Sequence, residues 1–298
     1  MLMDINNIKK NGKTGLANAL VEIEKNPFDK KSLSLLTQAY KSKSGSILGI
    51  TGPPGVGKSS LIKNLISYYR NKKKTIAVIA VDPSSKKTKG ALLGDRIRLE
   101  TDPNDKGLFI RSMAARDKLG GLASITLSST ILLNALFDIT IIETVGVGQS
   151  ETDISNIADT VLFCVQPGSG DSLQFMKAGI IEIPDIIAIT KSDLGDVAVN
   201  THNDVINSIK IGNYSKDQDI PIVLISSKEE KNIQVLASKI EEQQRNRLNY
   251  KNKKKEIRGI FWLEESIKEQ FGISGLKKLK NIGINKNSPF LEFLKITK

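Results

Sequence analysis

The chain has 298 residues and a formal net charge of +12. Its composition, 39% hydrophobic and 26% charged, is typical of a soluble globular protein. No run approaches the roughly 18 continuous apolar residues of a membrane span, and residues 1–7 include an acid and no apolar core, so we expect neither membrane attachment nor secretion. One cysteine and one histidine exclude an internal disulfide and a clustered Cys/His metal site within one chain, which makes a cytoplasmic protein the simplest interpretation.

The positive charge is scattered along the chain, with short runs at Lys72–Lys74 and Lys253–Lys255. A basic balance can indicate nucleic-acid binding. Aromatic residues make up only 5%, however, which leaves little stacking surface for single strands. We therefore expect a solvated basic surface and no nucleic-acid partner. The same charge would weakly attract anionic nucleotides or acyl-CoA substrates.

Residues 14–40 show the apolar spacing of two short helices, separated by a break at Asn26–Pro27. A polar connector follows over residues 41–46. This pattern predicts an N-terminal helical extension over residues 1–44.

A βα alternation begins after the connector. Seven short runs rich in Ile and Val are apolar on both faces, as the strands of a parallel sheet covered by helices are. Most are separated by enough chain for a crossover helix. We expect a doubly wound α/β domain over residues 45–240. The seven runs are Ile47–Ile50, Thr75–Val81, Leu108–Arg111, Ile139–Ile142, Val161–Val165, Ile186–Thr190 and Ile222–Ile225.

After residue 230 the chain is helical in pattern and highly charged, with sparse apolar positions at Leu236, Ile240 and Leu248. A helix this polar has few apolar side chains to bury against the core of a monomer. Its pattern suits an arm that packs on a second subunit. We therefore predict a C-terminal helical dimerisation arm over residues 241–298, and a homodimer. Trp262 is expected to pack this arm rather than to bind a cofactor.

A phosphate-binding loop follows the first strand. The sequence fits G-x-x-x-x-G-K-[ST] between a predicted strand and a predicted helix, the context that confirms this motif, whereas the alternative is an accidental glycine-rich turn. Backbone N–H groups and the helix N-terminus would surround the phosphates, Lys58 would reach the β- and γ-phosphates, and the Ser59 hydroxyl would ligate Mg²⁺. The nucleotide-binding residues expected here are Gly52, Pro53, Pro54, Gly55, Val56, Gly57, Lys58, Ser59 and Ser60.

Three acids are candidates for the metal side of this site. Asp82 and Glu143 end predicted strands, and Asp95 follows Asp82 by 13 residues. Ligands of open α/β sheets bind at the carboxyl edge of the strands, and Mg²⁺ takes a few oxygen ligands while keeping several waters. We expect all three acids, with Ser59, to serve the metal and catalysis. Alternatively, Asp82 and Asp95 are helix caps or turn residues.

A second motif predicts guanine as the base. Thr190, Lys191 and Asp193 match [NT]-K-x-D after a predicted strand. The Asp193 carboxylate can accept hydrogen bonds from N1–H and the 2-amino group of guanine, which adenine lacks, so GTP and GDP are the expected ligands. Ser226 and Ser227, after the last predicted strand, would close over the base.

These motifs occur in a recognisable order. The chain resembles the MeaB/ArgK family of G proteins, which is associated with methylmalonyl-CoA mutase, and the most specific matching string is Glu143–Glu151. Departures from the family pattern occur at Lys86–Gly90, at Thr190 and at Ser227–Lys228. The other matching segments are Val81–Ser85, Leu93–Arg98, Phe109–Ala114, Gly120–Leu122 and Pro167–Asp171.

The resemblance implies a homodimeric GTPase chaperone that loads and protects the adenosylcobalamin cofactor of an acyl-CoA mutase, most simply methylmalonyl-CoA mutase. It also implies that Asp82, Asp95 and Glu143 are the metal-side and catalytic acids. A mobile switch would correspond to Gly168–Lys177, with Lys177 completing the site when the mutase binds.

Two other functions remain open at this point. A nickel-insertion GTPase for hydrogenase or urease would have a similar domain, although one cysteine and one histidine argue against a nickel store. A P-loop kinase of a small acceptor or of a transport protein is the second alternative. The guanine motif argues against it.

Overall fold

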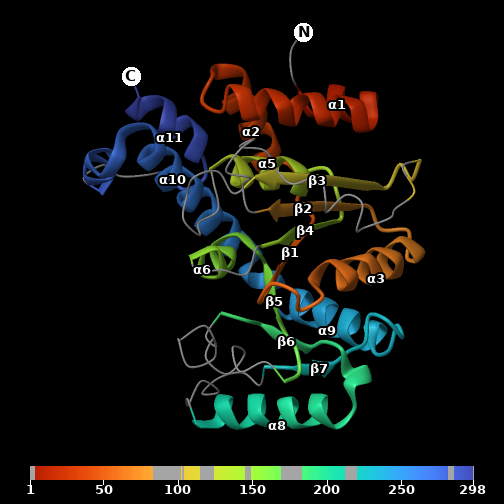
Figure 1. The fold of residues 1–298 in the computed structure, drawn as a ribbon. Coiled ribbons are helices and arrows are strands. Elements are labelled where there is room, and N and C mark those ends of the chain that lie inside the picture. Colours follow the sequence, from red (N-terminus) through yellow and green to blue (C-terminus); the bar gives the residue numbers. More distant parts are fainter. Residues whose placement is uncertain are drawn as a thin grey trace, which may run out of the picture.

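A seven-stranded parallel sheet forms the centre of the molecule (Figure 1). The computed structural model describes residues 4–82, 102, 104–114, 124–144, 149–168, 183–211, 220–280 and 285–297. The strand order is β3-β2-β4-β1-β5-β6-β7, and every pairing in it is parallel. All seven predicted strands are confirmed: β1 (Ser46–Thr51), β2 (Ile76–Asp82), β3 (Leu108–Ala114), β4 (Ile139–Glu143), β5 (Thr160–Val165), β6 (Ile186–Ile189) and β7 (Ile222–Leu224).

Helices flank this sheet, which confirms the predicted α/β fold class. In the described part of the chain they are α1 (Ile5–Lys25), α2 (Lys30–Lys41), α3 (Lys58–Asn71), α5 (Ser124–Asn134), α6 (Gln149–Ile157), α8 (Asp196–Ile211), α9 (Ile233–Asn246), α10 (Lys251–Lys280) and α11 (Pro289–Ile296). Short 3-10 helices lie at Ser192–Leu194 and Leu248–Tyr250. None of the helices within the described ranges is both long and apolar enough to cross a lipid bilayer.

The two faces of the sheet bury different helices because successive side chains of a strand point to opposite faces. Leu48 and Ile50 of β1 join a core cluster with residues of α3 and α9. Ile47, on the opposite face, joins a second cluster with residues of α2, α5, α6 and α10. A third cluster packs α8 against β5 and β6.

The N-terminal extension begins its first helix earlier than predicted. Asp4 caps α1 by accepting a hydrogen bond from the backbone N–H of Asn7 (2.7 Å), and Ile5 and Ile8 are buried. The helix kinks at Gly12, where φ is 57°, and then continues. The expected break is confirmed, since α1 ends at Lys25 and Asp29 caps α2 through Ser32 (2.6 Å).

The C-terminal helices pack on the same chain. Leu236 and Ile240 of α9 are fully buried against the sheet. This helix ends at Asn246 and therefore crosses residue 240, the predicted domain boundary. Trp262 of α10 is fully buried, donates to the Ser128 hydroxyl (2.8 Å) and packs against Phe290 of α11 (4.3 Å between ring centroids). The sparse apolar positions Leu236 and Ile240 thus have partners within the monomer, and a dimerisation role for residues 241–298 remains a prediction.

Candidate functional site

The predicted phosphate-binding loop lies at the carboxyl end of β1 and leads directly into α3. Gly52 has a φ of 136°, and a Cβ added there would collide with the carbonyl oxygen of Cys164 in β5. Gly57, the residue before α3, has a φ of 100°. Only glycine adopts such conformations without strain, so these positions allow the backbone to turn back over the end of the sheet.

Lys58 is the first residue of α3 and is 7% exposed. Its ammonium donates hydrogen bonds to the carbonyl oxygens of Gly52 (2.7 Å) and Pro53 (3.0 Å). The cation is therefore held inside the loop rather than in solvent. A β- or γ-phosphate entering the loop would offer this ammonium stronger acceptors than two neutral carbonyls.

The two predicted metal-side groups on α3 and β4 are adjacent. The Ser59 hydroxyl donates to Oε1 of Glu143 at 3.0 Å, and Glu143 is 7% exposed at the end of β4. A hydroxyl and a carboxylate side by side beside a phosphate loop are the oxygen donors that Mg²⁺ prefers. Ser59 and Glu143 fit a magnesium ion, which they would hold and which would neutralise phosphate charge there.

The structure describes only one of the other three predicted catalytic residues, and only its backbone. Asp82 is the last residue of β2 and lies in register with Ala114, so its backbone is at the carboxyl edge of the sheet, as expected. Asp95 and Lys177 lie outside the described residues.

A pair of threonines that sequence reasoning missed links the strands beneath the loop. The Thr144 hydroxyl donates to the Thr51 hydroxyl (2.8 Å), and the Thr144 backbone N–H donates to the carbonyl of Ile50 (3.1 Å). Both threonine side chains are buried. This contact fixes the end of β4, and with it Glu143, against the start of the phosphate loop. In the sequence, the feature that could have pointed to Thr51 and Thr144 was their position at the ends of two apolar strands.

The predicted guanine-recognition segment touches the phosphate loop. The Thr190 hydroxyl lies within hydrogen-bond distance of the carbonyl oxygens of Val56 (2.7 Å) and Val165 (3.1 Å). The Lys191 ammonium donates to the carbonyl of Gly55 (3.0 Å) and to the side chain of Gln166 (2.8 Å). The start of this segment is thus tied to the loop through the Thr190 hydroxyl and the Lys191 ammonium.

Asp193 lies in the 3-10 helix after Lys191 and faces the loop after β7. It accepts a hydrogen bond from the Ser226 hydroxyl at 2.7 Å, which holds the pKa of the Asp193 carboxyl below its usual range. The carboxylate expected to bind guanine is therefore charged at neutral pH. Ser227 is held in turn, because its carbonyl accepts from the Asn64 side chain of α3 (3.0 Å). Asn64, like Gln166, was not predicted.

Comparison with known proteins finds a matching family and related sequences. Residues 15–275 match the family described as methylmalonyl-CoA mutase-associated GTPase MeaB. A protein of Pyrococcus abyssi whose name describes it as a GTPase is 44% identical over 191 residues, which cover 63% of this chain and 58% of that protein. The methylmalonic aciduria type A homolog of Caenorhabditis briggsae, named as mitochondrial, is 40% identical over 185 residues, 60% of this chain and 45% of that protein. The chain thus spans little more than half the length of the first relative.

A solved structure shares the fold. The crystal structure of a protein named LAO/AO transport system kinase superposes with a TM-score of 0.65, covering 98% of this chain and 96% of that one. The sequence identity is 22%, so this likeness concerns the fold alone.

Proposed function

We propose that this chain, which belongs to the MeaB family of methylmalonyl-CoA mutase-associated GTPases, binds GTP and hydrolyses it to GDP and phosphate. The observation that carries the proposal is the direct bonding of the guanine-recognition segment to the phosphate loop. Thr190 and Lys191 donate to Val56 and Gly55, which sets one spacing between the base and phosphate ends of a nucleotide.

In this proposal the chain binds the two ends of GTP differently. Backbone N–H groups of the loop and the Lys58 ammonium bind the phosphates, while Asp193 accepts from the guanine N1–H and 2-amino groups. Mg²⁺, held by Ser59 and Glu143 with Asp82 and Asp95 as further candidates, would neutralise phosphate charge. Phosphoryl transfer to water needs this positioning and neutralisation rather than a protein nucleophile.

The biological role we propose is that of a chaperone. The family description associates its members with methylmalonyl-CoA mutase, and the C. briggsae relative is named for methylmalonic aciduria. We infer that this chain assists the loading and protection of adenosylcobalamin in an acyl-CoA mutase of that kind. A homodimer and a cytoplasmic location are parts of the same proposal.

The experiment that tests the activity measures free phosphate from GTP and from ATP, with Mg²⁺ and with EDTA. GTP with Mg²⁺ should release phosphate stoichiometrically with GDP, and ATP should not compete. Transfer of the γ-phosphate to an acceptor protein or small molecule, with no free phosphate, would instead establish the kinase alternative. A pull-down with purified methylmalonyl-CoA mutase, with GDP or a non-hydrolysable GTP analogue present, tests the partner.

Nickel insertion remains the weaker candidate because the one cysteine of the chain is buried. Cys164 is fully buried in β5, and burial raises the pKa of its thiol to about 12, so the thiolate that would bind nickel is disfavoured. Nickel analysis of the purified protein, with and without a chelator, decides this point.

A further inference from the structure

A second cavity lies at the opposite end of the sheet from the phosphate loop. Its volume is about 720 Å³, and its lining includes Ser46, Thr75 and Ile139, at or beside the amino ends of β1, β2 and β4. The phosphate loop follows the carboxyl end of β1. At roughly 3.3 Å per residue, the six-residue strand β1 separates the two sites by about 20 Å.

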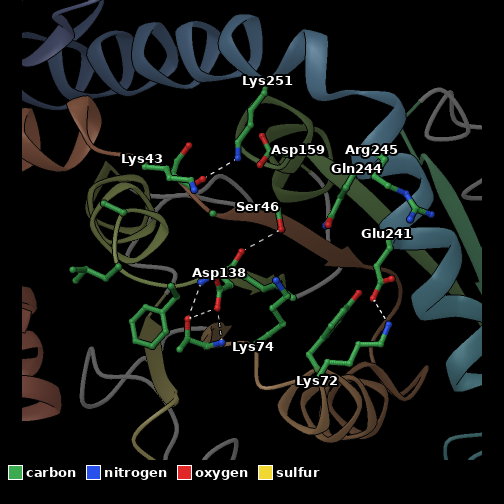
Figure 2. Close-up of a pocket in the computed structure, with 18 of the residues that line it drawn as sticks. Lys43, Ser46, Lys72, Lys74, Asp138, Asp159, Glu241, Gln244, Arg245 and Lys251 are labelled. Atoms are coloured by element: carbon green, nitrogen blue, oxygen red, sulfur yellow. Dashed lines mark hydrogen bonds and ion pairs between the residues drawn. The ribbon is translucent and has the colours of Figure 1, made fainter.

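The lining of this cavity is strongly cationic. It includes eight lysine and arginine side chains and three carboxylates, and the chain folds residues from α1, α3, α9 and α10 around it. Figure 2 shows Lys43, Lys74 and Lys251 around the same hollow as Asp138 and Arg245. A volume of this order lies within the range of small-molecule sites, roughly 300–1,000 Å³.

All three carboxylates already have partners in the protein. Asp138 accepts from the backbone N–H and the hydroxyl of Thr75 (2.8 and 2.9 Å), and these bonds lower the pKa of its carboxyl. Asp159 pairs with Arg258 (2.7 Å) and also accepts from the backbone of β1 (2.8 Å). Glu241 pairs with Lys72 at 2.9 Å. All three carboxylates are therefore already bonded to other groups of the protein.

Four of the cations are not bonded in this way, although Lys43 and Lys74 also interact electrostatically with Asp138. Lys9, Lys43, Lys74 and Arg245 form no salt bridge and no side-chain hydrogen bond with any described residue. The other cations of the lining are tethered, as Lys251 is to the carbonyl of Ser44 (2.8 Å). The cavity therefore carries an excess of positive charge, which attracts anions.

The wall also holds unsatisfied polar groups. Tyr69, in the last turn of α3, is 2% exposed, and its hydroxyl has no hydrogen-bond partner among the described residues. The Nε2 atom of Gln244 on α9, also in the lining, is buried and lacks a partner within the same ranges. Buried polar groups normally have partners, and a ligand with hydrogen-bonding groups would supply them in this wall.

We propose that this cavity binds a small phosphorylated molecule of about nucleotide size. Lys9, Lys43, Lys74 and Arg245 would pair with its phosphate oxygens, and the Tyr69 hydroxyl and Gln244 amide would bond its polar groups. Leu136 and Phe137, also in the lining, supply apolar surface for a base or another flat group. The site is separate from the phosphate loop and does not depend on the proposed GTPase activity.

Calorimetric titration with inorganic tripolyphosphate, ADP and adenosine tests the proposal, using the Lys58→Ala protein so that the phosphate loop binds weakly. Tripolyphosphate and ADP should bind, and uncharged adenosine should not. The double variant Lys43→Glu/Lys74→Glu should weaken both by about tenfold or more, because two cations become anions beside the phosphates. Tyr69→Phe should weaken ADP binding by a few-fold, about the value of one hydrogen bond.

The matched control is Lys31→Glu/Lys210→Glu, which makes the same charge change on exposed lysines of α2 and α8 outside the cavity. It should change the affinity by less than about twofold at about 0.15 M salt, where surface charges are screened. Equal weakening by control and cavity variants would overturn the proposal in favour of diffuse attraction. So would tighter binding of a hexaglutamate peptide than of tripolyphosphate. If the double variant fails to fold, Lys43→Gln/Lys74→Gln replaces it.

Discussion

We predict that phosphate binding depends most on Lys58. Its ammonium is held by Gly52 and Pro53 at the start of α3, and no other described lysine donates to these two carbonyls. We expect Lys58→Ala to lower GTP turnover by about 10² to 10³, the usual loss of a preorganised donor to transition-state charge. Phosphate release assays measure this loss, with Lys31→Ala as a control on an exposed helix position. Turnover close to the parent level would contradict the assignment of the loop.

Asp193 is predicted to determine the base. In Asp193→Asn a carboxylate that accepts two hydrogen bonds becomes an amide with an N–H₂ donor, so affinity for GDP should fall by about 10². The same amide can donate to the 2-oxo group of xanthine, so XDP should bind the variant more tightly than it binds the parent. Competition titrations with GDP, XDP and ADP measure both changes. An unmutated protein that binds ADP as well as GDP would show that the motif is accidental.

The residues of the site were predictable to different degrees for a physical reason. Lys58, Ser59 and Asp193 belong to short contiguous motifs, so a local pattern in the sequence is enough to find them. The hydrogen bond between Thr144 and Thr51 joins residues 93 positions apart, and that between Asn64 and Ser227 joins residues 163 apart. Such contacts depend on how strands and helices meet, which no local pattern records.

At the scale of elements, the strands were the most predictable part. A strand such as β1 is apolar on both faces because helices cover both, and the resulting run is visible directly. The helices outside the sheet were harder. α1 begins at Ile5 although the stretch around Gly12 is polar. The sequence of α10 suggested a helix that packs on a second subunit, whereas its Trp262 is buried within the same chain. Packing partners far along the chain decide both.

The packing of α10 leads to a stability prediction. Trp262 is fully buried between Ser128 and the rings of Phe290 and Phe293, so Trp262→Ala should lower the free energy of unfolding by about 3–5 kcal/mol. Phe271, on the same helix, is 41% exposed, and Phe271→Ala should cost much less. Urea denaturation monitored by circular dichroism compares the two. Equal losses would show that α10 does not stabilise the domain through its buried face.

At the scale of the whole molecule, the chain is basic and its last helices cover one side of the α/β core (Figure 1). Exposed apolar side chains remain in this region, including Phe271 and Ile273, which is 71% exposed. We predict a homodimer that uses the surface around these residues. Light scattering should give twice the monomer mass, and Ile273→Asp should shift it towards one chain. A single monomer mass at high concentration would refute the dimer.

The last prediction concerns activation by a partner. Hydrolysis by the isolated protein should be slow, because GTPases that lack a transition-state cation lose about 10³ to 10⁵ in rate. Lys177 is the predicted source of that charge. It lies outside the described residues, nine positions after Gly168. If the mutase brings Lys177 to the γ-phosphate, adding the mutase should raise GTP turnover. Lys177→Ala should then remove the stimulation and leave the basal rate nearly unchanged, while Lys177→Arg should restore part of it. Steady-state turnover with and without purified methylmalonyl-CoA mutase measures all three. Full stimulation of the Lys177→Ala protein would reject this mechanism without affecting the phosphate loop, whose geometry rests on Lys58 and Ser59.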